Sequence, residues 1–413
     1  MSVDIKALRQ RLLVGGLVIL VVGYVALLPT LRKVQQDTLN INVQTDVSQS
    51  QALGIIASKA ELEQARKSAL DNPNSLDAQL SYATIALNVG YLDAASQAVD
   101  AAKKLTATNP AIMILDGEIW QRRKKYAKAI PLYREALRIA PNQPRAVNGL
   151  SVIYLALGWT QPAREILNDA VRANPTDRNL RYGLALANVQ SSAFREAEGL
   201  LLQLQRENPD DRNLWGPLVD VYLKSTRPQS ALAVLEAEQT KRPPEKNLLD
   251  ALSRAYLAVG NVDAAIKAAT AGYLLEPGDV VIQYQLALCY LKRSDTKSAL
   301  PWLEKVERQS PGFDKVRLHL GQILLTRGKP VEARRLLGLY KTSEGSKAHR
   351  IKLNLAVSMQ GDKVLPHFAM AKLYQSEGNL DRAIIELRRT VELDINRTTG
   401  ADILLAECER QQP

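Results

Sequence analysis

Alanine recurs every 34 residues along most of this 413-residue chain. The series consists of Ala95, Ala129, Ala163, Ala197, Ala231, Ala265, Ala299 and Ala333. A second series of mostly very small residues lies twelve positions upstream, and prolines from Pro141 to Pro311 follow the same spacing. A fixed period of this length indicates an array of structural repeats rather than one compact domain.

Each period contains two apolar-periodic stretches of about a dozen residues, which predicts two helices. Two helices pack closely where one side chain is small enough to admit the ridge of the other, so the two small-residue series are expected at the helix crossings. Proline disfavours helix in the residue before it, and the proline series therefore predicts the end of every second helix. The sequence predicts an all-α chain of stacked helix pairs.

The stretch from Pro144 to Pro175 resembles the tetratricopeptide repeat. The residues that match the family's positions are Leu150, Ser151, Tyr154, Gly158, Ala163, Leu167, Ala170 and Pro175. The same frame fits seven further stretches in strict register. The resemblance implies a right-handed superhelical solenoid of about nine helix-turn-helix units, whose first helices line a concave groove.

The register breaks after the eighth unit, because Ala383 follows Ala333 by 50 residues instead of 34. Sixteen inserted residues around 346–361 are expected to form an extra helix. The predicted organisation is a basic tail at 1–11, a transmembrane anchor at 12–31, a polar linker at 32–50, a capping helix at 51–73, eight units at 76–345, an inserted basic helix at 346–363, a ninth unit at 364–395 and a C-terminal capping helix at 396–413.

Residues 12–28 contain no charged residue, and with residues 29–31 they approach the thickness of a bilayer's hydrocarbon core, about 30 Å. A cleaved signal peptide is the alternative, but no small-x-small cleavage site follows, so an uncleaved anchor is expected. Three basic residues precede the span and two follow it. This asymmetry favours an inside N-terminus and an extracytoplasmic repeat domain.

The sequence contains few of the residue patterns that are typical of catalytic sites. The three histidines have no Cys, His or carboxylate neighbours at metal-ligand spacing, and neither a phosphate loop nor a nucleophile elbow occurs. We therefore predict no enzyme activity, no metal and no cofactor. Binding of protein or peptide ligands is the expected role.

The resemblance also implies which positions of the first helices face the groove. The residues at these positions are Arg145, Asn148, Asn179, Tyr182, Asn213, Asp220, Asn247, Asp250, Arg254 and Tyr284. Asn179, Asn213 and Asn247 occupy one position in consecutive units, and their amides could donate to and accept from a peptide backbone. Alternatively, these asparagines cap the helices that they begin. Both interpretations stay open at this point.

The net charge of +11 is unevenly distributed along the chain. The predicted basic patch consists of Arg122, Arg123, Lys124, Lys125, Arg334, Arg335, Lys347, Arg350 and Lys352. These residues are interpreted as solvated helix faces, as contacts for acidic proteins or anionic lipid headgroups, or as a nucleic-acid surface. Nucleic acid is the less favoured partner, because the groove lacks interleaved basic and aromatic residues.

These observations predict a membrane-anchored scaffold that binds proteins or peptides, some of them acidic, and supports assembly of an envelope-associated complex. One alternative is a cytoplasm-facing adaptor that recruits a soluble enzyme to the membrane. Another is an RNA-binding helical-repeat protein. The oligomeric state is left open.

Overall fold

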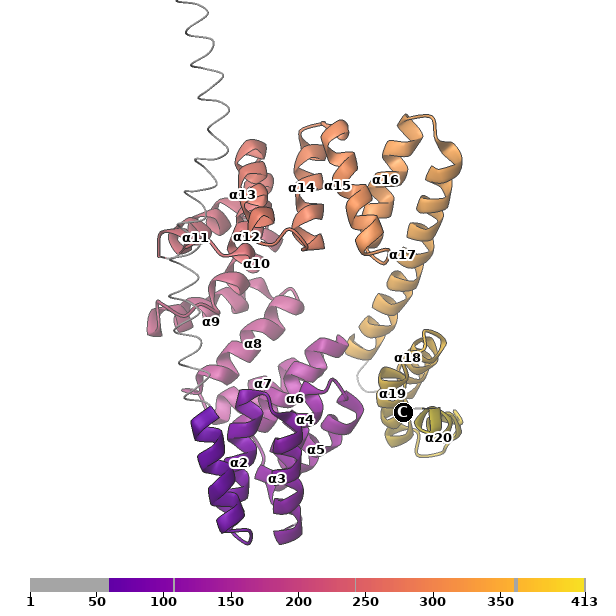
Figure 1. Ribbon diagram of the computed structural model, residues 1–413. Coiled ribbons are helices and arrows are strands. Elements are labelled where there is room, and N and C mark those ends of the chain that lie inside the picture. Colours follow the sequence, from indigo (N-terminus) through magenta and orange to yellow (C-terminus); the bar gives the residue numbers. More distant parts are fainter. Residues whose placement is uncertain (1–58, 107, 242, 360–362, 412–413) are drawn as a thin grey trace, which may run out of the picture. The chain divides into compact units, whose positions relative to one another are not determined.

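The computed structural model describes residues 59–106, 108–241, 243–359 and 363–411, and every regular element in these ranges is an α-helix (Figure 1). Residues 59–71 are helical. The helices that follow are α2 (Leu76–Val89), α3 (Leu92–Leu105), α4 (Pro110–Arg122), α5 (Tyr126–Ile139), α6 (Pro144–Leu157), α7 (Thr160–Ala173), α8 (Arg178–Gln190), α9 (Phe194–Glu207), α10 (Trp215–Lys224), α11 (Pro228–Lys241), α12 (Lys246–Ala258), α13 (Val262–Leu275), α14 (Val280–Lys292), α15 (Thr296–Gln309), α16 (Asp314–Thr326), α17 (Pro330–Met359), α18 (Val364–Ser376), α19 (Leu380–Leu393) and α20 (Ala401–Gln411). The all-α prediction is confirmed for these residues.

The chain divides into two compact units, residues 1–106 and 107–413. In the first unit α2 packs on α3, and Gln79 at the start of α2 donates a hydrogen bond to the carbonyl of Ala69. In the second unit the helices pack in consecutive pairs from α4 with α5 to α18 with α19. Most first helices also contact the first helix of the next pair, as in α6 with α8 and α12 with α14. This is the stacking of a helical-repeat solenoid.

The small-residue series lie where the sequence places them. Every alanine from Ala95 to Ala333 in the 34-residue series is fully buried, and the upstream series from Ala83 to Gly321 is buried as well. The second helices α5, α7, α9, α11, α13 and α15 each end two residues before a proline of the third series. The predicted roles of small residues at crossings and of proline as a terminator are confirmed.

Ion pairs join neighbouring units at the starts of their first helices. Arg178 pairs with Asp211, and Lys246 pairs with Asp279. Arg212 lies 3.6 Å from Glu245. Each basic residue meets an acidic residue 33 positions later, so the same contact recurs across three successive boundaries between units.

Helix α17 differs from the expected organisation, because it runs through 30 residues without a break. Residues 346–359 continue the second helix of the eighth unit instead of forming a helix of their own. The position that holds proline in the six preceding units holds Gly345 here. Glycine inside a helix costs only about 1 kcal/mol, whereas proline costs about 3, so the stop signal is missing. The other predicted domain boundaries stay predictions.

The last three helices return to the beginning of the second unit, which the sequence analysis did not anticipate. Helix α19 packs against α5, and one hydrophobic core contains residues of both, among them Ile130, Trp159 and Ile385. We call this contact of α18–α20 with α5–α7 the C-terminal clasp.

Buried polar contacts hold the C-terminal clasp. The indole N–H of Trp159 donates to Glu386 Oε1 at 3.1 Å, and Glu386 Oε2 shares a hydrogen bond of 2.7 Å with His367 Nδ1. Burial raises the pKa of Glu386 above its ordinary value, and the hydrogen bond with His367 opposes that rise. Arg134 pairs with Glu392 at the edge of the contact. These contacts satisfy both oxygens of a carboxylate that is almost fully buried.

None of the helices in the described ranges combines the length and apolarity needed to cross a bilayer. The predicted tail at 1–11, anchor at 12–31 and linker at 32–50 lie outside the residues that the structure describes.

Candidate peptide-binding groove

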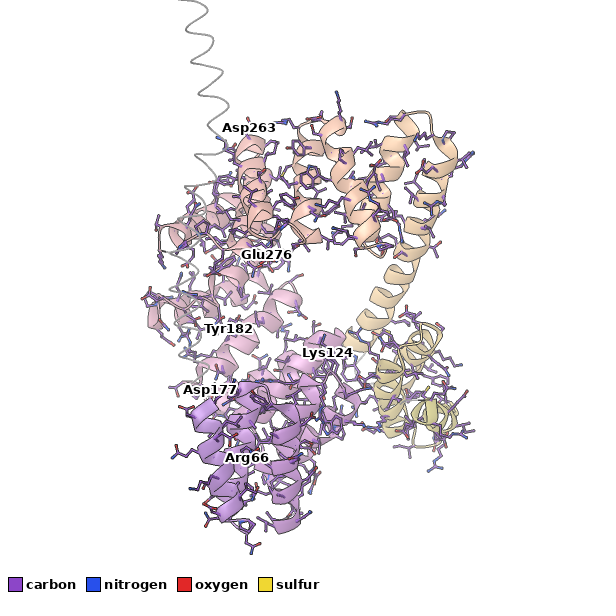
Figure 2. All side chains as sticks on the ribbon, in the orientation of Figure 1. Arg66, Lys124, Asp177, Tyr182, Asp263 and Glu276 are labelled. Atoms are coloured by element: carbon purple, nitrogen blue, oxygen red, sulfur yellow. The ribbon has the colours of Figure 1, made fainter. Side chains whose placement is uncertain are left out.

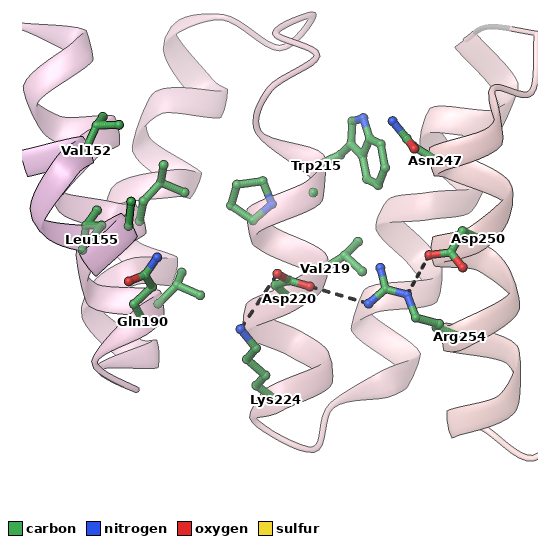
Figure 3. Close-up of a pocket in the computed structure, with 15 residues that line it drawn as sticks. Val152, Leu155, Gln190, Trp215, Val219, Asp220, Lys224, Asn247, Asp250 and Arg254 are labelled. Atoms are coloured by element: carbon green, nitrogen blue, oxygen red, sulfur yellow. Dashed lines mark hydrogen bonds and ion pairs between the residues drawn. The ribbon is translucent and has the colours of Figure 1, made fainter. Parts of the chain in front are cut away.

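Two adjoining hollows follow the first helices of the second unit, with volumes of about 680 Å³ and 550 Å³. The first is lined by α6, α8, α10 and α12 (Figure 3), and the second by α12, α14 and the start of α16. Both include Asp250 and Arg254, so we treat them as one groove. Volumes of this size are typical of ligand-binding clefts in proteins.

One half of the groove is apolar. Helix α6 contributes Val152 and Leu155, helix α8 contributes Val189, and helix α10 contributes Trp215 and Pro217. The Val152 side chain is 52% exposed although it sits on a first helix inside the array. Exposed apolar side chains in a concave surface are typical of sites that bind other molecules.

The second hollow repeats this apolar character with aromatic side chains. Tyr284 and Phe313 lie with their ring centroids 4.9 Å apart, and Val281 beside them is 49% exposed. Burial raises the pKa of Tyr284 to about 12, so its hydroxyl remains a neutral hydrogen-bonding group at physiological pH. The groove therefore offers apolar surface on both sides of Asp250 and Arg254.

A cluster of charged side chains separates the two apolar parts. Arg254 Nε donates to Asp250 Oδ2 at 3.1 Å, and the Arg254 guanidinium lies 3.9 Å from Asp220 (Figure 3). Lys224 lies 3.9 Å from the other side of Asp220. Asn247 lines the same hollow. These residues come from α10 and α12, so two neighbouring units build the cluster.

Asp250 is the most enclosed member of this cluster. Its side chain is 18% exposed, and its Oδ1 atom is buried with no hydrogen-bond donor among the described residues. Burial raises the pKa of Asp250, and the positive charge of Arg254 partly offsets that rise. A buried carboxylate oxygen without a donor carries an unfavourable free energy of desolvation.

The predicted groove residues divide into two sets. Asp220, Asn247, Asp250, Arg254 and Tyr284 line the groove. The residues that do not line either hollow are Arg145, Asn148, Asn179, Tyr182 and Asn213. Arg145 forms an ion pair of 2.7 Å with Glu118, and the Tyr182 hydroxyl donates to the carbonyl of Asn213 at 3.3 Å. A ligand role for either set stays a prediction.

The asparagine series does not cap helices. Asp177 caps α8 by accepting a hydrogen bond from the Leu180 amide, and the residue at the cap position of α12 is Glu245. At α10 the cap position belongs to Leu214. The capping interpretation of Asn179, Asn213 and Asn247 is therefore wrong, because each lies next to a cap position or within the first turn. All three are exposed.

The basic residues fall into two separate parts of the second unit. Arg122 ends α4, and Arg123, Lys124 and Lys125 form the turn between α4 and α5, where Figure 2 labels Lys124. Lys124 has a φ of 59°, and Arg123 lies over the ring of Trp120. The exposed pair Arg334 and Arg335 belongs to α17. The side chains of Lys347, Arg350 and Lys352, also on α17, lie outside the description.

The residues of the C-terminal clasp were missed by the sequence analysis, although one signal was available. The residue three positions after each alanine of the series is apolar in all eight earlier units, whereas the ninth unit has Glu386 there. A carboxylate at an apolar position needs a buried partner. That partner is Trp159, which directly follows the turn glycine of the third unit.

The geometry defines a class of protein, a helical-repeat solenoid with a groove along its first helices. Residues 122–188 and 251–312 each match a family model described as tetratricopeptide repeat. These two stretches are tetratricopeptide repeats.

Several solved structures resemble the chain at low sequence identity. A tetratricopeptide repeat protein from Parabacteroides merdae is 16% identical, with a TM-score of 0.50 over 59% of this chain and 97% of its own. The human IFIT1 dimer with PPP-AAAA is 15% identical, with a TM-score of 0.49 over 82% of this chain and 87% of its own. Pseudomonas aeruginosa PilF is 17% identical, with a TM-score of 0.44 over 52% and 96%. No curated protein matches the sequence.

Proteins with this repeat are in general non-catalytic scaffolds for interactions with other proteins. Within the described ranges, no group of three or more His, Cys, Asp or Glu side chains is placed to hold a metal ion. Among the described residues, the groove is the site with the most developed geometry.

Proposed function

We propose that this chain is a membrane-anchored scaffold whose groove binds a protein or peptide and which supports assembly of an envelope-associated complex without catalysis. In this proposal about nine helix-turn-helix units form a right-handed superhelix behind the anchor at 12–31. The observation that supports binding most is the groove itself, where first helices of successive units expose apolar side chains around a charged cluster.

The two kinds of surface in the groove suit different parts of a bound segment. Burying the exposed side chains of Val152 and Val281 contributes about 25 cal/mol for each Å² removed from water. The charged cluster around Asp250 determines the orientation of the bound segment, because hydrogen bonds with ionised groups depend on geometry. A ligand that pairs with both surfaces is held in one register along the groove.

Acidic partners are proposed for a second surface, outside the groove. Arg334 and Arg335 are exposed on α17, and the turn between α4 and α5 carries four consecutive basic residues. Such surfaces attract acidic proteins or anionic lipid headgroups over distances of about 10 Å at moderate salt. Nucleic acid is the less favoured partner in this proposal.

We propose further that the repeats lie on the extracytoplasmic side of the membrane. Protease added to intact spheroplasts is expected to remove a C-terminal tag from the chain while a cytoplasmic marker protein stays whole. The chain should sediment with membranes before digestion. A tag that stays protected until the membrane is broken would contradict this placement and would favour a cytoplasm-facing adaptor.

A further inference from the structure

The charged cluster in the groove resembles a cation site that is occupied by the protein's own side chain. Asp220 on α10 and Asp250 on α12 lie on either side of the Arg254 guanidinium, at 3.9 Å and 3.1 Å. Arg254 belongs to the same helix as Asp250, one turn further on. The carboxylates of two neighbouring units thus converge on the Arg254 guanidinium inside the groove, and Asp220 also lies 3.9 Å from Lys224.

Arg254 is held weakly enough to be displaced. Its side chain is 44% exposed, and its contact with Asp220 is at the outer limit of an ion pair. Exposed ion pairs contribute only about 0–1 kcal/mol to stability. The contact with Asp220 is therefore easily given up, and a basic side chain that takes over the hydrogen bond to Asp250 can replace Arg254 between the two carboxylates.

Asp250 is the carboxylate of the cluster that most needs a positive partner. Its buried Oδ1 has no donor among the described residues, and burial raises the pKa of its carboxyl group. A donor that enters from the groove would bring a positive charge close to the carboxylate and favour its ionised form. Hydrogen bonds between charged groups in partly dry sites are stronger than those in water.

Building on the proposed function, we infer that the groove selects segments in which a lysine or arginine is flanked by apolar or aromatic residues. The basic side chain of the segment replaces Arg254 between Asp220 and Asp250. The flanking residues contact Trp215 and Val152 on one side and Val281 on the other. The partner class is thus basic and amphipathic in the groove, in contrast to the acidic partners proposed for α17.

A selection from a phage-displayed library of random short peptides tests this inference on the full-length chain, immobilised in mild detergent. The expected outcome is enrichment of peptides with one lysine or arginine beside apolar or aromatic residues. Enriched peptides that are acidic, or that lack a basic residue, would overturn the inference and leave the proposed groove function standing. Selection of no peptide above the empty matrix would count against both.

Matched variants with opposite expected changes in peptide affinity distinguish this inference from simple unfolding, which would weaken binding in each of them. The best synthetic peptide should bind Asp250→Asn about tenfold or more weakly, the loss of a charged hydrogen bond. It should bind Arg254→Ala several-fold more tightly, because the internal competitor is gone. Asp263→Asn on α13, outside the groove, should leave affinity unchanged. Equal affinity for wild type and Asp250→Asn, or weaker binding to Arg254→Ala, would contradict the inference, provided that circular dichroism shows both variants folded.

Discussion

Replacing Trp159 with alanine is expected to lower the free energy of unfolding by about 3–5 kcal/mol and to release the C-terminal clasp. The indole ring is 3% exposed, packs edge-on against His367 with centroids 5.5 Å apart, and donates to Glu386. The substitution leaves a cavity and removes the donor from a buried carboxylate. Chemical denaturation measures the loss, and amide hydrogen exchange of α18–α20 measures the release.

A matched control separates the clasp from general packing. Trp302 on α15 is partly exposed and contacts Tyr273, away from α18–α20. Trp302→Ala is expected to destabilise the protein less and to leave amide protection in α18–α20 unchanged. If both variants lose the same protection in α18–α20, or if neither does, the clasp does not hold the ninth unit in place.

Gly149→Ala is expected to lower the free energy of unfolding by about 1–3 kcal/mol, against the normal preference of helices for alanine. A Cβ atom at Gly149 would lie 2.3 Å from Cζ of Tyr133, closer than any carbon contact allows. The tyrosine ring cannot withdraw, because it is fully buried and also lies against Gly117, where a Cβ atom would be 3.0 Å from the ring's Cε1. Its hydroxyl also donates to Gln121 at 2.6 Å. Thermal or chemical denaturation measures the change.

The repeat supplies its own control for this substitution. Gly183 occupies the same position one period later, and there the neighbour is Leu167, whose Cδ2 would lie 3.1 Å from the new Cβ. Leu167 can shift by a few tenths of an ångström, so Gly183→Ala should change stability by less than about 1 kcal/mol. Tyr133→Leu should make Gly149→Ala nearly neutral in the double variant. A Gly149→Ala protein as stable as wild type would show that the ring is not confined.

The periodic part of the fold was predictable because its physics is local. A small side chain at each crossing and a proline after each second helix determine how neighbouring helices pack. Both features recur every 34 residues. The continuous α17 was predictable by the same logic, from Gly345 at the proline position, whereas the length of the insertion indicated a separate helix. Local signals such as these can be interpreted without knowing which segments, distant in sequence, pack against each other.

The clasp was not predictable in the same way, since its partners are more than 200 residues apart. Glu386 breaks the apolar pattern of its repeat position, yet nothing in a single sequence pairs this exception with Trp159. The groove was predicted in part for a related reason. The resemblance identified the face of the first helices, whereas the depth of the hollow at Asp250 depends on how α10, α12 and α14 stack.

The most direct test of the account is photo-crosslinking in living cells, with a photoreactive amino acid placed at one position at a time. Val152 and Val281 are exposed in the groove, and Leu274 on the second helix α13 is a comparably exposed apolar control at 63%. If the groove binds the partner, Val152 and Val281 should yield the same crosslinked product, and Leu274 should not yield it. A product that forms at Leu274 and is absent from both groove positions would contradict the proposed function.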